Sequence, residues 1–304
     1  MTLLQAPASH DREPDAAVYR HARMARDYLT SFVRSRGELR SFSTIESYCM
    51  FIGHARSGHS IVGAMLDAHP NVILPDEVDA LRYVAAGFSR EQLFHILLAR
   101  SRRQVRKERT KAGRNGKSYS YRVPDQWQGR FSTLKVIGDS KAGKSTQRLA
   151  QSPAILERLR RCMGNVDLRF IHVVRNPYDN ISTLMVRGGR TFDNAITQYF
   201  ANCEALVAIR RRVGESLLTI RQEQVILQPG PTLQQLCGFL KLAAPDDYLQ
   251  ACAGILYTSL PKSRFSVPWD DALIERVRRK IDEFDFLAGY AYDERATEQT
   301  TWSA

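Results

Sequence analysis

Apolar runs that alternate with helix-like segments constrain the fold of this chain more than any other feature. The strand-like runs are YCMFIG (48–53), LKVIG (134–138), LRFIHVV (168–174) and LLTIR (217–221). Each is followed by residues with helical periodicity. Apolar strands separated by helices are typical of a parallel sheet that is covered on both faces. We therefore predict an α/β fold with a central parallel sheet flanked by helices, and we expect ligands at the carboxyl ends of its strands.

Length and composition predict one main domain with peripheral ends. In the 304-residue chain we expect a helical arm at 1–46, with an amphipathic helix around 16–32, a domain at 47–292 and a flexible tail at 293–304. No apolar run approaches the roughly 18 residues of a membrane span, and the N-terminus lacks a secretory signal pattern. Five cysteines without C-x-x-C spacing favour a reduced cytoplasm over disulfides or a metal site. No pattern indicates an oligomeric state.

The charge of the chain is strongly positive and unevenly distributed. The net charge of +12 predicts an anionic ligand or partner. A basic insertion at about 100–130 contains ten Lys or Arg and one acid between Arg100 and Arg122. This run is interpreted as a solvated loop, a lid over an anionic substrate or a contact with a polyanion. Nucleic-acid modules usually add aromatic platforms or a recognition helix, so no nucleic-acid partner is expected.

The segment GDSKAGKS (Gly138–Ser145) satisfies the Walker A pattern G-x-x-x-x-G-K-[ST]. A strand-like run precedes it and a helix-compatible stretch follows, as a nucleotide-binding P-loop requires. A working Walker A site also needs a carboxylate at the end of a second strand to hold Mg²⁺. The obvious second strand, LRFIHVV, ends in Arg175 instead. The chain thus has the Walker A pattern without the matching carboxylate. A P-loop kinase or NTPase is kept only as an alternative function.

Two other strand-to-helix turns carry residues suited to phosphate. In FIGHARSGHSIVGAMLDAHP (51–70), a basic residue, Arg56, lies in a glycine-bracketed turn at the start of a helix. Such a turn combines free backbone N–H groups, the helix dipole and a full charge, although an ordinary turn with an N-cap serine fits the same letters. In IHVVRNPYDNISTLMVR (171–187), a buried strand ends in Arg175, and hydroxyl residues follow eight residues later. Arg175 could bind phosphate together with a hydroxyl, or pair with Asp179 across one helical turn.

Taken together, the two turns resemble the sulfotransferase family, closest to bacterial sulfotransferases and more distantly to tyrosylprotein sulfotransferases. The family's 5′-phosphosulfate loop, P-[KR]-S-G-T-T followed by a helix and HP, reads ARSGHS with DAHP here. Its 3′-phosphate loop, R-x-P-x-x-x-x-x-S, reads RNPYDNIST. The resemblance spans roughly residues 48–292. It implies a P-loop-like sulfotransferase fold, the donor 3′-phosphoadenosine 5′-phosphosulfate (PAPS) and the product adenosine 3′,5′-bisphosphate (PAP).

Position by position, the resemblance implies a set of donor-binding residues. Those at the 5′-phosphosulfate are Arg56, Ser57, Gly58, His59 and Ser60. Those at the 3′-phosphate are Arg175 and Thr183, with Ser182 as the fallback hydroxyl. A basic segment near the C-terminus often covers the cofactor in this family, and Lys262 and Arg264 occupy it here. A plain loop entering the next helix would look the same.

The chemistry requires a base for the acceptor and cations for the leaving group. Glu77 follows the loop arginine at the distance of the catalytic glutamate of the tyrosylprotein enzymes, and Lys141 matches their lysine near the bridging oxygen. We predict Glu77, Lys141, Arg56 and His59 as catalytic, with His59 as the rival base and a surface acid as the other interpretation of Glu77. The acceptor would be a hydroxyl, or an amine, of a small molecule, sugar or lipid.

Departures from the family pattern limit what the resemblance implies. The family's loop proline is His54 here, its first loop threonine is His59, and the tyrosine of its "YED" stretch is Gln222. The adenine ring must therefore stack on another residue. The acceptor-binding arginine of the tyrosylprotein enzymes is Asp79 here, which argues against a tyrosyl-peptide acceptor. His172 lies inside an apolar strand and is interpreted as a core histidine.

Overall fold

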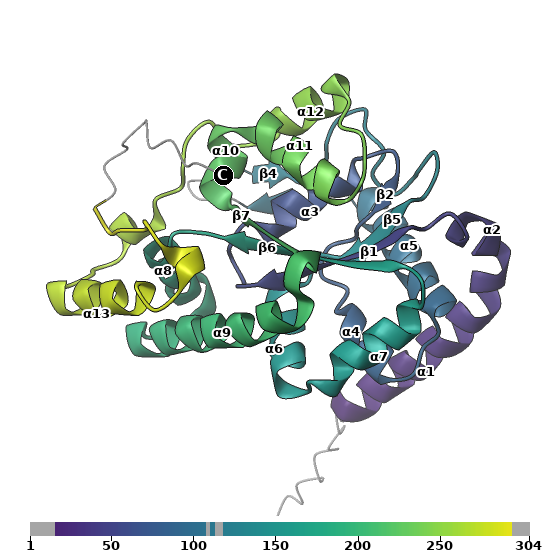
Figure 1. Ribbon diagram of the computed structural model, residues 1–304, viewed down its shortest axis with the longest axis horizontal. Helices are drawn as coiled ribbons and strands as arrows, with labels where there is room; N and C mark the ends of the chain where they lie inside the picture. The colour runs from purple at the N-terminus through teal and green to yellow at the C-terminus, as the bar shows by residue number, and fades with distance from the viewer. Residues whose placement is uncertain (1–15, 108–109, 113–117, 294–304) are drawn as a thin grey trace, which may run out of the picture.

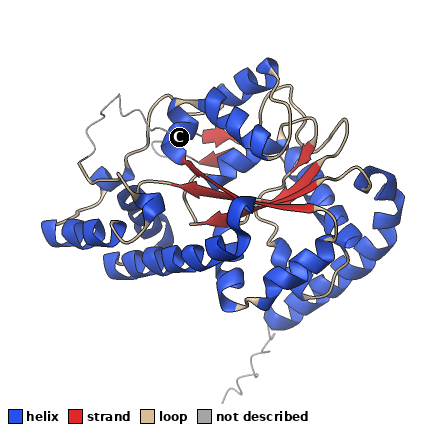
Figure 2. Cartoon of the chain, viewed as in Figure 1, coloured by secondary structure: helices blue, strands red, loops and turns tan. Residues whose placement is uncertain are grey.

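A computed structural model of the chain describes residues 16–107, 110–112 and 118–293. Its centre is a five-stranded, fully parallel sheet in the order β2-β5-β1-β6-β7 (Figure 1). The strands are β1 Ser47–Gly53, β2 Val72–Ile73, β5 Val136–Asp139, β6 Asp167–Val174 and β7 Leu217–Arg221. Helices lie on both faces of the sheet (Figure 2). The predicted α/β class is confirmed.

The described helices cover the sheet and its edges. They are α1 Ala16–Arg34, α2 Leu39–Phe42, α3 His59–Asp67, α4 Ala80–Ala85, α5 Arg90–Arg106, α6 Ala142–Gln151, α7 Ala154–Met163, α8 Pro177–Gly188, α9 Phe192–Val213, α10 Gln222–Leu227, α11 Pro229–Phe239, α12 Asp246–Ala253 and α13 Asp271–Ile281. The helix expected at 16–32 is α1. Pro177 occupies the first position of α8, where its missing N–H costs nothing.

Side chains of β1 alternate between two hydrophobic cores because successive residues of a strand point to opposite faces. Tyr48, Met50 and Ile52 pack with α4, α5, α7 and α9 on one face. Cys49 and Phe51 pack with α3, α11 and α12 on the other. β1 is flanked by β5 and β6, so the carboxyl ends of these three strands lie next to one another. This arrangement brings the turns after Gly53, Asp139 and Val174 to one edge of the sheet.

Two features of the fold were not predicted from the sequence. The short edge strand β2 has only two residues, too few to give a periodic signal. Within the basic insertion, β3 Thr110–Ala112 and β4 Ser118–Ser120 pair in antiparallel fashion. Residues 108–109 and 113–117 of that insertion, the first fifteen residues and the tail from 294 lie outside the described residues. Among the helices of the described ranges, none is both long and apolar enough to cross a membrane.

Candidate active site

The turn between β1 and α3 forms an anion cradle of five residues, 54–58. Two of them have left-handed backbone, Arg56 with φ 68° and Gly58 with φ 95°. At Gly58 a side chain would be strained, and a Cβ would lie 2.9 Å from the side chain of Gln222. The first N–H groups of α3 have no partners within the helix. The turn therefore presents backbone donors, the helix dipole and the exposed Arg56 together.

Arg175, at the end of β6, joins this cradle to two distant segments. One terminal nitrogen of its guanidinium donates to Arg56 O at 3.3 Å and to Thr183 Oγ1 at 3.2 Å. The other donates to Pro261 O at 2.8 Å and to Ser263 Oγ at 2.9 Å. Only 6% of Arg175 is exposed. The Arg175 guanidinium is thus held rigidly by uncharged oxygen atoms. Because these oxygens include atoms of both predicted phosphate motifs, Arg175 joins the two motifs in one site.

Asp179, the alternative partner that the sequence offered for Arg175, pairs with a different arginine. Both carboxylate oxygens of Asp179 accept from Arg264, one from its backbone N at 2.8 Å and one from its guanidinium at 2.6 Å. Arg264 is 1% exposed, and its Nε and Nη2 have no hydrogen-bond partner among the described residues. Unused donors on a buried guanidinium are costly. The sequence missed this arrangement because residues 179 and 264 are far apart in the chain.

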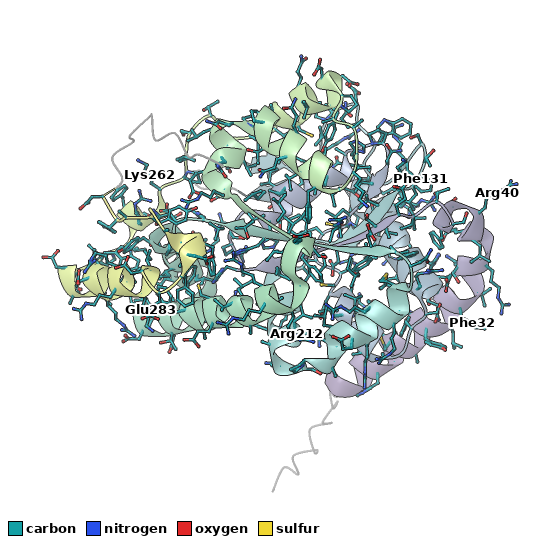
Figure 3. The ribbon with its side chains drawn as sticks, viewed as in Figure 1. Phe32, Arg40, Phe131, Arg212, Lys262 and Glu283 are labelled. Atoms are coloured by element: carbon teal, nitrogen blue, oxygen red, sulfur yellow. The ribbon has the colours of Figure 1, made fainter. Side chains whose placement is uncertain are left out.

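A pocket opens where these groups meet. Its lining includes Arg175, Lys262 and Arg264 together with Gln222 and Pro261, and Lys262 is labelled in Figure 3. Three basic side chains from two segments therefore face one small cavity. Two acids, Asp179 and Glu223, line it as well, and Asp179 is paired with Arg264. The guanidinium and ammonium groups of the lining are suited to a phosphate group.

The two candidate hydroxyls of α8 have different roles. Thr183 Oγ1 meets Arg175 and also donates to Ser263 Oγ at 3.2 Å. Ser182 Oγ donates to Tyr178 O at 2.7 Å and accepts from Trp269 Nε1 at 3.0 Å. Thr183 thus belongs to the arginine cluster, whereas Ser182 ties α8 to the segment before α13. As a correction, we do not retain Ser182 as a phosphate ligand.

Glu77 and Lys141, each predicted as catalytic, meet at the neighbouring edge of the site. Glu77 Oε2 lies 3.1 Å from Lys141 Nζ, and both side chains are partly accessible. Glu77 has left-handed backbone with φ 56°, which is uncommon for a residue with a Cβ. Lys141 caps the start of α6, and the adjacent turn packs against the cradle, since a Cβ on Gly143 would lie 3.3 Å from Ala55 N. The pair therefore lies beside the Arg56 turn.

A buried carboxylate, Asp139, holds this pair in place. Its Oδ1 accepts from Val78 N at 3.0 Å and Lys141 N at 3.2 Å, and its Oδ2 accepts from Ala80 N at 2.7 Å. Asp139 is fully buried, and this burial raises its pKa to about 6 even though the three backbone N–H groups favour the charged form. The Asp139 carboxylate thus holds both the loop that contains Glu77 and the backbone of Lys141.

Asp79 stabilises the same loop rather than an acceptor. Its backbone is also left-handed, with φ 63°. Both its oxygens accept from Arg148 on α6 at 2.7 Å, from Nε and Nη2. Such a bidentate pair fixes geometry as well as charge. The sequence around Asp79 and Arg148 does not predict this ion pair, because the contact depends on how α4 and α6 pack.

GDSKAGKS does not form a Walker A loop. Only two residues separate the end of β5 at Asp139 from the start of α6 at Ala142. Gly143 and Lys144 therefore lie inside a helix, whereas a phosphate-cradling loop would contain the glycine. Each glycine has a packing reason instead: a Cβ on Gly138 would lie 1.9 Å from Cys49 O of β1, and Gly143 approaches the cradle. The alternative of a P-loop NTPase is thereby contradicted.

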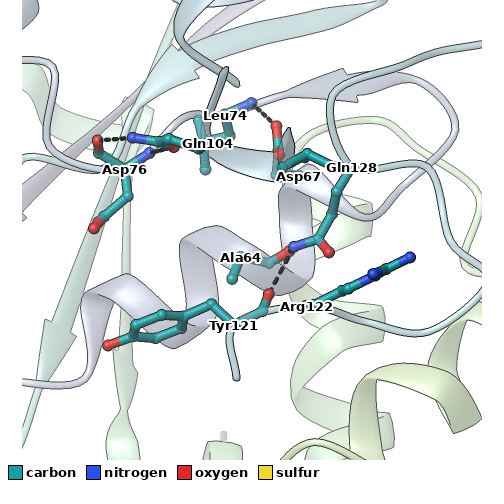
Figure 4. A pocket seen from close by; sticks show the side chains of 9 residues that line it. Ala64, Asp67, Leu74, Asp76, Gln104, Tyr121, Arg122 and Gln128 are labelled. Carbon is teal, nitrogen blue, oxygen red and sulfur yellow. Dashed lines mark hydrogen bonds between the residues drawn. The ribbon is translucent and has the colours of Figure 1, made fainter. Parts of the chain in front are cut away.

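A second hollow is lined by residues of α3, of the end of α5 and of the segments around Asp76 and Tyr121 (Figure 4). The side chains that line it include Asp67, Asp76, Gln104, Arg122 and Gln128. Asp76 N donates to Gln104 Oε1 at 2.9 Å, and Gln104 Nε2 donates to Asp76 O at 2.7 Å. The Asp76 carboxylate accepts from Ser140 Oγ at 2.8 Å. Asp76, which lines the hollow, directly precedes Glu77, and most of the surface inside the hollow is apolar because the amides of Gln104 and Gln128 bond to backbone groups.

Three histidines surround the cradle without being exposed. His59 is 6% exposed, and its Nδ1 lies 3.4 Å from Ser57 Oγ. His54 stacks on Tyr199 with ring centroids 4.1 Å apart, and burial lowers its pKa to about 4. His172 is fully buried, neither of its ring nitrogens has a hydrogen-bond partner in the described part of the chain, and burial lowers its pKa well below the usual value. His172 is therefore a core histidine, as predicted.

Comparison with known proteins gives one family. A sequence profile described as "Sulfotransferase family" matches residues 50–246. Solved structures with similarity include a sulfotransferase domain from the Synechococcus PCC 7002 olefin synthase (16% identity, 77% of this chain, 88% of that chain, TM-score 0.44). A sulfotransferase from Mycobacterium avium (10%, 85%, 81%, 0.45) and one from Alicyclobacillus acidocaldarius (14%, 79%, 95%, 0.43) are further examples. No curated protein sequence matches the chain.

Proposed function

Because the chain belongs to the sulfotransferase family, we propose that it transfers a sulfuryl group from PAPS to a hydroxyl or amine acceptor. The predicted family is confirmed by the profile match, and the donor, the acceptor and the residue roles are proposals. The observation that carries them is the convergence of the two phosphate motifs on Arg175, whose guanidinium reaches both Arg56 O and Thr183 Oγ1.

The residues of the site divide into two groups that would hold PAPS. Arg175, Thr183 and Ser263, with Lys262 and Arg264, would bind the 3′-phosphate in the basic pocket. Arg56, Ser57, Ser60 and the backbone N–H groups at the start of α3 would bind the 5′ end, and His59 would donate to it. The Arg264 guanidinium, which is held by Asp179, would add positive charge beside the phosphate.

PAPS, when bound, supplies the sulfuryl group and leaves as PAP. Glu77 takes the proton of the acceptor hydroxyl as the new bond to sulfur forms. We assign the base to Glu77 rather than His59 because Glu77 is exposed, whereas His59 is buried beneath the cradle. Lys141 and Arg56 stabilise the negative charge that develops on the leaving oxygen, a task for which fixed cations suffice.

The hollow that Asp76, Gln104 and Arg122 help to line is the proposed acceptor site. Asp76 directly precedes Glu77, so an acceptor bound there would lie close to the base. Most of the surface inside it is apolar, with Leu74 and Val105 beside a few polar groups, which favours an acceptor with an apolar body and a small number of polar groups. Asp79, which replaces the acceptor arginine of the tyrosylprotein enzymes, is occupied by Arg148, and this argues against a tyrosyl peptide.

Calorimetric titration with PAP, and separately with ATP and Mg²⁺, tests the donor. We expect micromolar PAP binding that does not depend on Mg²⁺ and is strongly weakened in Arg175→Ala. Lys144→Ala is the matched control, since this exposed lysine lies within α6 and should leave PAP binding unchanged. Absence of PAP binding by the folded protein, or binding of Mg-ATP that is lost in Lys144→Ala, would overturn the proposal.

A further inference from the structure

The outward face of α1 is an apolar stripe on the surface of the molecule. Residues 22, 25, 29, 32 and 33 recur at the three- and four-residue spacing of one helix face, and all are exposed. Leu29 is 67% exposed, Val33 66% and Phe32 47%. Of the eleven exposed large hydrophobic residues found in the described ranges, six lie in α1 and α2. Phe32 projects away from the body of the protein in Figure 3.

The opposite face of α1 fixes the orientation of this stripe. Ser31 is buried, and Gln92 of α5 donates to Tyr28 O at 3.0 Å and to Ser31 Oγ at 3.3 Å. Tyr83 donates to Asp27 Oδ2 at 3.0 Å, and the ring of Tyr28 packs edge-on against Phe88 with centroids 5.0 Å apart. Since these polar contacts hold one face of α1 against α5 and α4, the apolar stripe cannot turn inward without breaking them.

Basic side chains border the stripe. Exposed arginines in α1, in the turn after it and in α2 are Arg23, Arg26, Arg34, Arg36 and Arg40. The Arg36 guanidinium lies over the Phe32 ring, 4.6 Å from its centroid. The acid of α1, Asp27, faces Tyr83 on the inner side and is partly neutralised by Arg23 and Arg26. The surface thus combines an apolar centre with a strongly positive margin.

We propose that this face of α1 docks on an anionic lipid bilayer surface, with Leu29, Phe32 and Val33 entering the headgroup–acyl boundary. A helix with an apolar stripe, flanking arginines and modest overall hydrophobicity is suited to lie in that boundary plane. Each arginine near the surface adds attraction to anionic headgroups. A second copy of the chain fits less well, because antiparallel or parallel pairing of two such faces would bring the positive margins together.

Vesicle co-sedimentation of the full chain tests the proposal without reference to its enzymatic activity. The probes are vesicles of phosphatidylcholine alone and vesicles that also contain phosphatidylglycerol. We expect binding to the anionic vesicles that falls as salt is raised. The double substitution Leu29→Gln with Phe32→Gln should weaken binding on the order of a hundredfold, and Arg26→Gln about fivefold.

A matched control places the same change elsewhere on the surface. Val186 and Leu227 are 57% and 61% exposed, so Val186→Gln with Leu227→Gln removes similar apolar area and should leave vesicle binding unchanged. Equal loss in both double variants would overturn the proposal, as would no vesicle binding by the folded wild-type protein. A dimer that the α1 variant dissociates, found by analytical ultracentrifugation in the absence of vesicle binding, would assign the face to a second copy instead.

Discussion

The two ends of the proposed donor site are built in opposite ways. At the phosphate end, Arg175 is buried and held by hydroxyl and carbonyl oxygens from Arg56, Thr183, Pro261 and Ser263. At the transfer end, Glu77 and Lys141 form an accessible ion pair. Strong binding needs a rigid, desolvated cation, whereas proton transfer needs a base that the acceptor can reach.

The backbone differs between the two ends as well. Arg175 follows a regular strand, but Glu77 and Asp79 both have left-handed backbone and are tied down by Asp139 and Arg148. Such left-handed conformations persist only where several surrounding contacts hold the backbone in place. The comparison predicts that substitutions at one end change binding, whereas substitutions at the other change turnover.

Removing the base should give the largest effect. Glu77→Gln keeps the size of the side chain but removes its ability to take a proton, so we expect kcat to fall roughly a hundredfold to ten-thousandfold. PAP affinity should stay nearly constant. The control is Glu46→Gln, because Glu46 makes a similar exposed ion pair with Lys135 at 3.3 Å far from the site. Unchanged turnover in Glu77→Gln would transfer the role of base to another residue.

Truncating the buried cation should act on binding instead. Arg175→Ala removes four hydrogen bonds and a desolvated charge, so we expect the Kd for PAP to rise about a hundredfold. Calorimetry measures this, with the exposed Arg187→Ala on the following helix as control. A variant that stayed folded by circular dichroism yet bound PAP normally would remove Arg175 from the phosphate site.

The Asp139 tether should affect turnover and the pH dependence of stability. Asparagine offers one acceptor oxygen in place of two, so one loop N–H among those of Val78, Ala80 and Lys141 would face an amide donor. We expect kcat to fall about tenfold in Asp139→Asn, with PAP affinity retained. Equal losses of kcat and PAP affinity would point to general misfolding.

The stability signature follows from the raised pKa of Asp139, about 6 in the folded protein against an ordinary 3.8. Since the folded state holds this proton more tightly, the stabilisation is fully present at low pH and is lost as pH rises through 6. Relative to Asp139→Asn, the wild type should gain up to about 3 kcal/mol as pH falls from 7 toward 4. Urea unfolding at several pH values measures the difference, and parallel profiles would contradict the burial argument.

Ser263 should show the smallest effect and sharpen the comparison. Its hydroxyl accepts from Arg175 at 2.9 Å and from Thr183 at 3.2 Å, so Ser263→Ala removes one support of the fork. We expect PAP affinity to fall about fivefold, corresponding to about 1 kcal/mol, with kcat unchanged. Ser266→Ala is the control, because its hydroxyl bonds only to Ser263 O among the described contacts. A change in kcat without a change in PAP affinity would indicate that Ser263 acts at the transfer end rather than at the phosphate end.

Local sequence determined the parts of this protein that depend on one stretch of chain. Apolar runs predicted four of the five central strands, and the cradle and the Arg175–Thr183 pair each lie within one strand–turn–helix unit. In such a unit, backbone geometry alone fixes where side chains eight residues apart will lie. The phosphate motifs were therefore readable from spacing, and the resemblance added Glu77 and Lys141 from corresponding positions.

Tertiary structure decided the rest, because the deciding contacts join residues far apart in the chain. Asp139 reaches Val78 across 61 positions, and Arg264 reaches Asp179 across 85. The Walker A pattern shows the same limit: its letters fit a phosphate loop, but the helix begins at Ala142 and encloses Gly143 and Lys144. The spacing of residues in a motif does not reveal where the helix starts. Here the packing of α6 against a neighbouring strand and turn sets its first residue. The close approach of β5 to β1 and of α6 to the cradle therefore placed Gly143 and Lys144 in a helix rather than in a phosphate-binding loop.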